Sequence, residues 1–266
     1  MTVGVVFRPQ QPPEELQDVV RYADEAGVGE LWLWEDCFLE GGLTTATAAL
    51  AWSRRVHVGI GLLPVPLRSP ALLAMEVATI ARLWPGRLVP TLGHGILEWM
   101  AQVGEAVGSP VTLLREYTAA VRDLLDGRRV DVSGRYVRLD GVALGWPPAT
   151  RPPLLVGARG PRTIRLAGEV GDGVLLDGVT DAATVARARA LVDESREASG
   201  RAGRAVVKAY TEVDPTLAPG TLAEQVGERA SRLREAGADT VVVQGSDRHP
   251  DPRPLIDALV SAGLAG

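Results

Sequence analysis

The sequence predicts a single (β/α)8 barrel, a closed parallel sheet of eight strands surrounded by eight helices. Short apolar or β-branched runs alternate with longer segments of helical period, which is typical of parallel strands joined by crossover helices. Eight such pairs can be counted, and the length of 266 residues is close to the about 250 typical of this barrel. An open doubly wound sheet is the alternative, but it would leave two edge strands to protect. One domain spanning residues 1–266 is therefore expected.

The first four strand and helix units follow one another in order. The predicted strands are residues 3–7, 30–34, 56–63 and 87–92, and the predicted helices are 12–27, 44–52, 70–83 and 112–126. Glu14 and Glu15 suit the amino end of the first helix, and Gly27 closes it. Pro70 is well placed in the first turn of the third helix. A long connection separates the fourth strand from its helix.

The second half begins with an insertion. Residues 130–139, which turn at Ser133 and Gly134, predict a small hairpin between the fourth helix and the fifth strand. The remaining predicted strands are 154–156, 174–176, 205–213 and 240–244, and the remaining helices are 161–169, 180–199, 221–236 and 254–262. These units complete the count of eight.

Composition excludes several classes of partner. The chain is 46% hydrophobic and 23% charged, with a net charge of -5, and it has no basic stripe, so nucleic acid is not expected as a partner. Its apolar stretches are short and interrupted and its start lacks a signal pattern, which predicts no membrane association and a cytoplasmic location. The single cysteine, Cys37, cannot form an intramolecular disulfide.

Reactive residues of such a barrel are expected just after the strands, at the carboxyl-terminal face. Glu35, Asp36, Cys37 and Phe38 follow the apolar second strand. A partly buried carboxylate such as Asp36 can act as an acid, a base or a hydrogen-bond acceptor. The alternative is that one of the two acids caps the next helix or pairs with an arginine. Cys37 is expected to pack rather than to act as a nucleophile, because no base can be assigned to it.

Glycines mark the third and fourth strands. Gly59 and Gly61 lie within the third, where they indicate either a closely approaching ligand or tight packing inside the barrel. The fourth strand ends in Gly93, His94 and Gly95, which could support a flat ligand. His94 is a candidate for catalysis or ligand contact, and a structural histidine is the alternative.

The loop after the fifth strand predicts an anion site. It reads Gly157, Ala158, Arg159, Gly160, Pro161, Arg162 and opens a helix. Main-chain amides and the positive end of the helix dipole would face an anion such as a phosphate. The three histidines fall on separate elements, so no metal site is predicted.

The chain resembles the bacterial luciferase-like superfamily, many members of which use the deazaflavin coenzyme F420. The segments that carry the resemblance are residues 23–27 with Leu31 and Trp32, 56–61 through 68–70, 86–95, and 153–162 with 166–168. The resemblance spans nearly the whole chain. It implies a non-proline cis peptide at Gly61 and Leu62 beneath the cofactor ring, the cofactor phosphate at residues 157–162, and a homodimer.

One departure from the family pattern stands out. Many relatives carry aspartate and histidine after the second strand, with the histidine near the hydride-accepting carbon, whereas here Asp36 is followed by Cys37. A thiol has a different pKa and geometry from an imidazole, so a mechanism that relies on this histidine is in doubt. His94 is a candidate replacement.

The resulting hypothesis is an oxidoreductase that uses F420 on a small organic substrate, with an FMN-dependent monooxygenase as the alternative. A non-catalytic cofactor-binding barrel is a hypothesis of another class, and a barrel isomerase or aldolase that uses Lys208, the only lysine, is a further one. Asp36 and His94 are the predicted catalytic residues. The predicted cofactor contacts are Gly61, Leu62, Leu63, Gly93, Gly95, Gly157, Ala158, Arg159, Gly160 and Arg162, and the predicted substrate pocket is Trp34, Cys37, Phe38 and Trp99.

Overall fold

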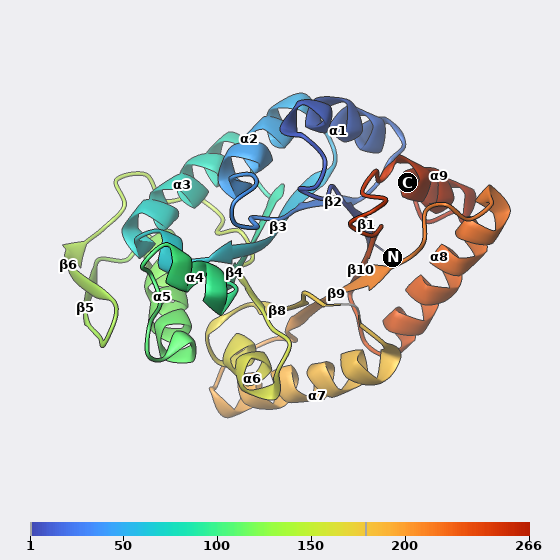
Figure 1. Cartoon of the computed structure of the whole chain (residues 1–266). Coiled ribbons are helices and arrows are strands. Elements are labelled where there is room, and N and C mark those ends of the chain that lie inside the picture. The colour runs from blue at the N-terminus through green and yellow to red at the C-terminus, as the bar shows by residue number, and fades with distance from the viewer. Residues whose placement is uncertain (1, 179) are drawn as a thin grey trace.

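The computed structural model, which describes residues 2–178 and 180–266, is a closed parallel barrel ringed by helices (Figure 1). The strand order around the barrel is β1-β10-β9-β8-β7-β4-β3-β2. These strands are β1 (Thr2–Val6), β2 (Glu30–Leu33), β3 (His57–Pro64), β4 (Leu88–Gly93), β7 (Leu155–Gly157), β8 (Gly173–Leu176), β9 (Val206–Glu212) and β10 (Thr240–Gln244). The predicted (β/α)8 fold is confirmed.

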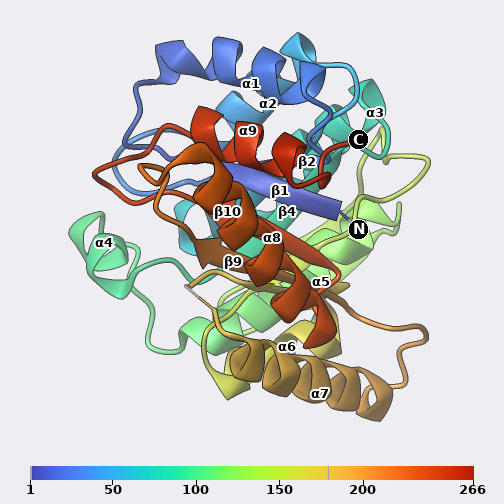
Figure 2. The ribbon, with the colours of Figure 1, turned by 90° about the vertical axis from the view of Figure 1, so that its right-hand side faces the viewer.

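The described part of the chain holds nine α-helices, one more than predicted. They are α1 (Leu16–Glu25), α2 (Gly42–Trp52), α3 (Pro70–Leu83), α4 (Leu97–Gln102), α5 (Pro110–Leu125), α6 (Pro161–Val170), α7 (Ala182–Ala198), α8 (Pro219–Glu235) and α9 (Arg253–Ser261). The additional helix, α4, lies in the long connection after β4 and projects from the body of the molecule (Figure 2). It spans fewer than two turns, too few for a helical period to show in the sequence.

A two-stranded antiparallel sheet, β5 (Val130–Ser133) and β6 (Arg138–Val142), stands apart from the barrel. It lies between α5 and β7, in the region where the sequence predicts a hairpin. The two strands pair as far as Ser133 and Arg138, so the turn covers residues 134–137.

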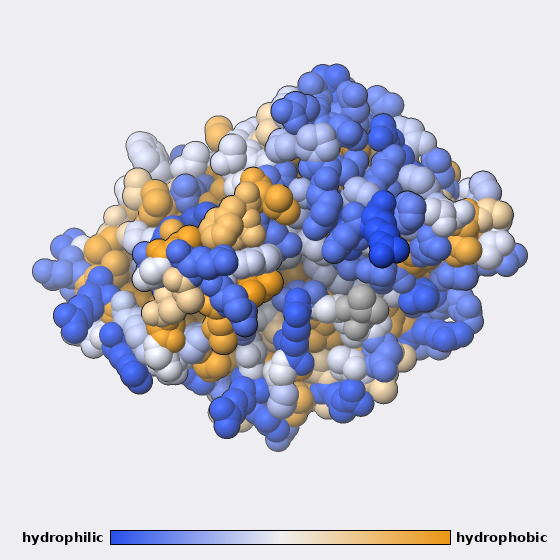
Figure 3. Space-filling view, in the orientation of Figure 1, coloured by the Kyte–Doolittle hydropathy of each residue, from blue (hydrophilic) through white to orange (hydrophobic). Residues whose placement is uncertain are grey.

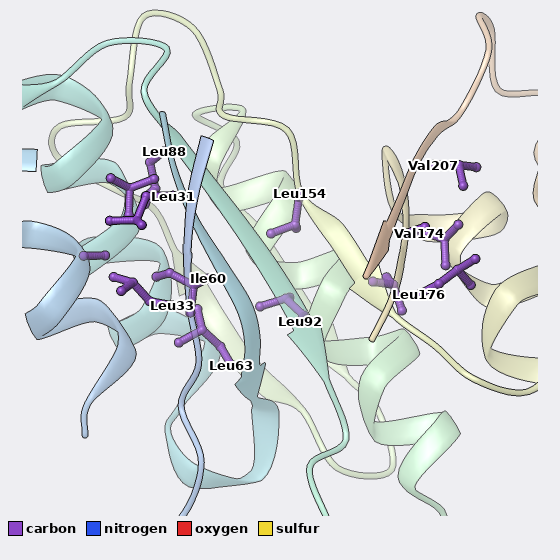
Figure 4. Close-up of a cluster of buried hydrophobic side chains, with 14 of the residues drawn as sticks. Leu31, Leu33, Ile60, Leu63, Leu88, Leu92, Leu154, Val174, Leu176 and Val207 are labelled. Carbon is purple, nitrogen blue, oxygen red and sulfur yellow. The ribbon is translucent and has the colours of Figure 1, made fainter. Parts of the chain in front are cut away.

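The main core lies between the barrel and its helices. Alternate strand residues such as Leu31, Leu33 and Ile60 point out of the sheet and are fully buried beneath the helices (Figure 4). Burying each such side chain contributes about 1.5–3 kcal/mol. This layer accounts for the near-continuous apolar character of the strands, since both of their faces are covered.

The inside of the barrel is packed around two aromatic rings. Trp32 and Tyr210 meet edge to face, with their ring centroids 5.8 Å apart. A Cβ atom on Gly59 would lie 2.4 Å from Cδ2 of Trp32, so this glycine makes room for the indole. Tight packing is therefore the correct interpretation of Gly59.

A buried ion pair closes the amino-terminal end of the barrel. The Lys208 ammonium lies 2.5 Å from Glu30 and donates to the Thr240 hydroxyl at 2.9 Å. Glu30 and Thr240 are the first residues of their strands. Lys208 is thus at the opposite end from the strands' carboxyl termini, which argues against an aldolase or isomerase based on this lysine. No helix among the described residues is both long and apolar enough to cross a bilayer.

Candidate active site

A cavity of about 350 Å³ opens at the carboxyl ends of the barrel strands. This is where barrel enzymes carry their reactive groups. Predicted site residues from five different segments meet in it, namely Trp34, Asp36, Gly61, Leu62, His94, Gly95, Trp99, Gly157, Ala158, Arg159 and Gly160. The fold therefore brings residues far apart in the sequence to one site.

Several lining residues were not predicted from the sequence. They are Pro64, Ile96, Leu97, Glu98, Thr163 and Asp177, and Glu35 also lines the cavity. Asp177 follows the short strand β8, where a single aspartate among apolar residues was the available signal. Within α4 only Trp99 was predicted from the sequence; Leu97 and Glu98 were missed, because the helix is too short to be recognised.

Other predicted residues lie elsewhere. Leu63 is 1% exposed and packs in the outer core (Figure 4). Arg162 is exposed on α6, and Phe38 is 64% exposed. None of these three side chains lines the cavity, and neither do Cys37 and Gly93.

The glycines at the mouth surround the side chain of Leu62. A Cβ atom on Gly93 would lie 2.4 Å from its Cδ2, and one on Gly157 would lie 2.5 Å from the same atom. These two glycines therefore leave space for a leucine. Leu62, together with the main chain at Gly61 and Gly157, forms an apolar floor to the cavity.

Two peptide bonds near the cavity are cis, Gly61–Leu62 and Cys37–Phe38. The first agrees with the position that the family resemblance implies. The second was not expected. The pKa of the Cys37 thiol is raised by burial and by the charges of Glu35 and Asp36, so the thiol stays protonated, as expected of a packing residue.

The two acids after β2 have different environments. Glu35 accepts two hydrogen bonds from Arg68, at 2.7 and 2.9 Å, and a third from the main-chain amide of Gly42 at 2.8 Å. It thus both pairs with an arginine and holds the first turn of α2, the structural alternative foreseen for one of these acids.

Asp36 is half-buried and makes no side-chain hydrogen bond with another described residue. Burial raises its pKa, and the positive charge of Arg8 opposes that rise. A desolvated carboxylate in a cavity is suited to accept a hydrogen bond or a proton from a ligand.

Arg8, two residues after the end of β1, supports one wall of the cavity. Its guanidinium lies 4.7 Å from the centroid of Trp34, whose ring stacks on Tyr210 at 6.0 Å. Arg8 also donates to the Gly245 carbonyl at 2.6 Å and pairs with Asp247. The indole that faces the cavity is therefore packed on both sides, between Arg8 and Tyr210. An arginine directly after the first strand was the sequence signal for this contact.

The amino end of α6 opens into the cavity. Its N-cap, Gly160, has no side-chain capping bond, while Thr163 in the first turn is buried and lines the cavity. Free amides at a helix amino end favour an anion. Arg159 pairs with Asp177 at 3.0 Å, so it gives the site little free positive charge.

His94 lies between the fourth strand and α4. It is half-buried and lines the cavity, and its Nδ1 is 2.7 Å from the Gly95 carbonyl. If Nδ1 donates this bond, Nε2 is left free to exchange a proton with a ligand.

Comparison with known proteins gives both sequence and structural relatives. The family model described as luciferase-like monooxygenase matches residues 1–218. The chain is 29% identical to 5,10-methylenetetrahydromethanopterin reductase of Archaeoglobus fulgidus over 177 residues, 66% of this chain and 53% of that protein. It is 31% identical to F420-dependent glucose-6-phosphate dehydrogenase of Nakamurella multipartita over 182 residues, 61% of this chain and 52% of that protein. The chain thus spans about half the length of these curated relatives.

Solved structures share the fold at lower identity. An F420-dependent secondary alcohol dehydrogenase superposes with a TM-score of 0.85 at 18% identity, covering 98% of this chain and 97% of that one. The oxygenating constituent of a diketocamphane monooxygenase from Pseudomonas putida, solved with FMN, gives a TM-score of 0.77 at 15% identity, again covering 98% and 97%. These structural similarities support the (β/α)8 barrel fold.

Proposed function

The chain belongs to the luciferase-like monooxygenase family, and from this premise we propose that it is an oxidoreductase that uses coenzyme F420 on a small organic substrate. An FMN-dependent monooxygenase is the alternative. The observation that carries the proposal is the cavity at the carboxyl ends of the strands, which combines an apolar floor with the open amino end of α6.

The described residues fit a flat cofactor that bears a phosphate. The uncapped amides at Gly160 and the buried Thr163 would hold the phosphate. Leu62 and the main chain at Gly61 would support the ring. When bound, F420 supplies two-electron hydride chemistry, whereas reduced FMN supplies oxygen activation.

The chain's own groups position the substrate and move protons. Asp36 would accept a hydrogen bond from the substrate, and His94 would hold or transfer a proton at Nε2 while Nδ1 remains bound to Gly95. Trp34, fixed by Arg8 and Tyr210, would present a rigid apolar face. Together with α4, it would keep water from the reacting atoms.

The preference for F420 comes from the relatives, because no described residue separates the two cofactors. Of the curated relatives named above, one is an F420-dependent glucose-6-phosphate dehydrogenase and the other a 5,10-methylenetetrahydromethanopterin reductase. Titration of each cofactor with the purified chain, followed by fluorescence quenching, tests the choice. Tight FMN binding without F420 binding would overturn it.

A non-catalytic cofactor-binding barrel is the second candidate, and Cys37 in the place of the family's histidine favours it. Turnover assays on Asp36→Ala and His94→Ala separate the two functions. An enzyme should lose turnover in both variants while it still binds cofactor. A binding protein has no turnover to lose.

The chain is also proposed to act as a cytoplasmic homodimer. The exposed face of α3 carries Leu72, Met75 and Leu83, which are 46%, 57% and 62% exposed. Their spacing places Leu72 and Met75 on one stripe, and an exposed apolar stripe of this kind favours association. Phe38 and Leu39 add to the exposed apolar surface of the chain.

A further inference from the structure

The charges that line the cavity do not balance. Four acids line it, Glu35, Asp36, Glu98 and Asp177, against one arginine, Arg159. Two of the acids are neutralised, since Glu35 pairs with Arg68 at 2.7 Å and Asp177 with Arg159 at 3.0 Å. These pairs leave no unmatched arginine or lysine in the described lining.

The other two acids have no partner among residues 2–178 and 180–266. Neither Asp36 nor Glu98 makes a side-chain hydrogen bond or an ion pair there. Arg8 acts on Asp36 through its charge, but its guanidinium is already bound to the Gly245 carbonyl and to Asp247. The side chains that line the cavity therefore carry an excess of negative charge, while the amino end of α6 offers main-chain amides to an anion.

One wall of the same cavity is apolar and exposed. Ile96 is 42% exposed, Leu97 is 54% exposed, and Trp99 is half-buried beside them. Figure 3 shows hydrophobic side chains gathered on the part of the surface that α4 occupies in Figure 1. Apolar side chains on a cavity wall gain free energy when an apolar ligand covers them.

We infer that the substrate is a neutral or cationic molecule with an apolar body, whose hydroxyl or ammonium group faces Asp36 and Glu98 and whose apolar part lies against α4. The inference rests on the proposed function in taking this cavity as the substrate site. Anionic substrates such as sugar phosphates and carboxylates are disfavoured, because they would approach the half-buried carboxylate of Asp36 and the exposed carboxylate of Glu98, neither of which is paired among the described residues.

Three matched probes test the inference. They are 2-(aminomethyl)naphthalene as the cation, 2-naphthalenemethanol as the neutral compound and 2-naphthoate as the anion, each titrated at pH 8 and low salt. Binding is followed by quenching of tryptophan fluorescence, on the free chain and on the chain saturated with F420. The cation should bind at least about tenfold more tightly than naphthoate, and this advantage should fall as salt is added.

Variants locate the source of the preference. In Asp36→Asn/Glu98→Gln, which keeps the size of both side chains and removes their charges, the advantage of the cation over naphthoate should disappear. Glu105→Gln/Glu224→Gln, which removes two charges from exposed positions outside the cavity, is the control and should keep the advantage.

Two results would overturn the inference: naphthoate binding as tightly as the cation, or a preference for the cation that survives in the double variant. The proposed function fails separately, if neither F420 nor FMN binds. In that event the measurements on the free chain still decide whether the cavity selects by charge.

Discussion

At the residue scale, the adjacent carboxylates of Glu35 and Asp36 have different environments and different proposed roles. Glu35 is buried and bonded to Arg68 and to the start of α2, whereas Asp36 faces the cavity without a partner among the described residues. The sequence identified the pair and favoured Asp36 as the catalytic acid, but it could not show what holds Glu35. The assignment depends on Arg68, which is distant in the sequence and reaches only one of the two.

The two acids should therefore respond differently to neutralisation. Glu35→Gln leaves Arg68 as a poorly compensated, largely buried charge and should lower the free energy of unfolding by about 3 kcal/mol. Asp36→Asn should leave stability unchanged or raise it at pH 8, since burial raises the pKa of Asp36 and so disfavours its ionised form. Urea unfolding of both variants at pH 8 checks this, and equal destabilisation would contradict it.

Glu40 predicts a pH dependence of stability. Both of its carboxyl oxygens are buried without a partner among the described residues, and burial raises its pKa from 4.5 to about 7. Between these values the folded chain holds a proton that the unfolded chain has lost, so this group's contribution to stability falls as the pH rises through the interval.

Glu40→Gln should remove that contribution to the pH dependence. At pH 8 the variant should be more stable than the unmodified chain by up to about 3 kcal/mol, because each unit of pKa shift corresponds to about 1.4 kcal/mol. At pH 4 the difference should vanish. Urea unfolding of both proteins between pH 4 and pH 8 measures this difference in stability, with Glu105→Gln at an exposed position as the control. A constant difference at all pH values would show that folding does not raise the pKa of the Glu40 carboxyl.

At the element scale, Leu62 joins three strands at the floor of the cavity. It extends from β3 over Gly93 of β4 and Gly157 of β7. The sequence marked both glycines as cofactor contacts, Gly93 under a flat ligand and Gly157 in an anion loop, but their immediate neighbour is the side chain of Leu62. This contact was unpredictable, because it depends on the closure of strands that are distant in the sequence.

Gly157→Ala should accordingly displace Leu62. The added methyl group would lie 2.5 Å from Cδ2 of Leu62, and such overpacking costs about 1–3 kcal/mol. In a Leu62→Ala background, Gly157→Ala should change the free energy of unfolding very little. A double-mutant cycle of unfolding free energies measures this coupling. Gly160→Ala, which meets no atom within 4 Å, is the control. Additive effects of the first two substitutions would contradict the packing account.

Most of the elements were predictable because their signals are local. Helix α3 occupies residues 70–83 as predicted, since Pro70 opens it and its apolar period is regular. Strand β10 also has its predicted bounds. The exception among the helices is α4, which is too short to show a helical period. Among the site residues, Asp177 and Thr163 were missed, because their place in the cavity follows from the closure of the barrel.

At the scale of the whole molecule, the stripe on α3 predicts a dimer. Leu72→Glu/Met75→Glu places charge on exposed apolar positions and should give a monomer in sedimentation velocity. Arg229→Glu makes the same change in net charge from an exposed site on α8, on the other side of the barrel (Figure 1), and should remain dimeric. A monomeric unmodified chain, or a double variant that stays dimeric, would rule out this interface.

The central claim is that the barrel mouth holds a phosphate-bearing flavin or deazaflavin, with the phosphate at the amino end of α6. The most direct measurement is a titration of F420 and FMN fluorescence with the chain, with Thr163→Glu and with the uncharged control Thr163→Val. The account predicts saturable binding of one cofactor per chain, at least about tenfold weaker in Thr163→Glu than in Thr163→Val, because a carboxylate there repels the phosphate. Absence of binding for both cofactors, or equal binding by the two Thr163 variants, would contradict it.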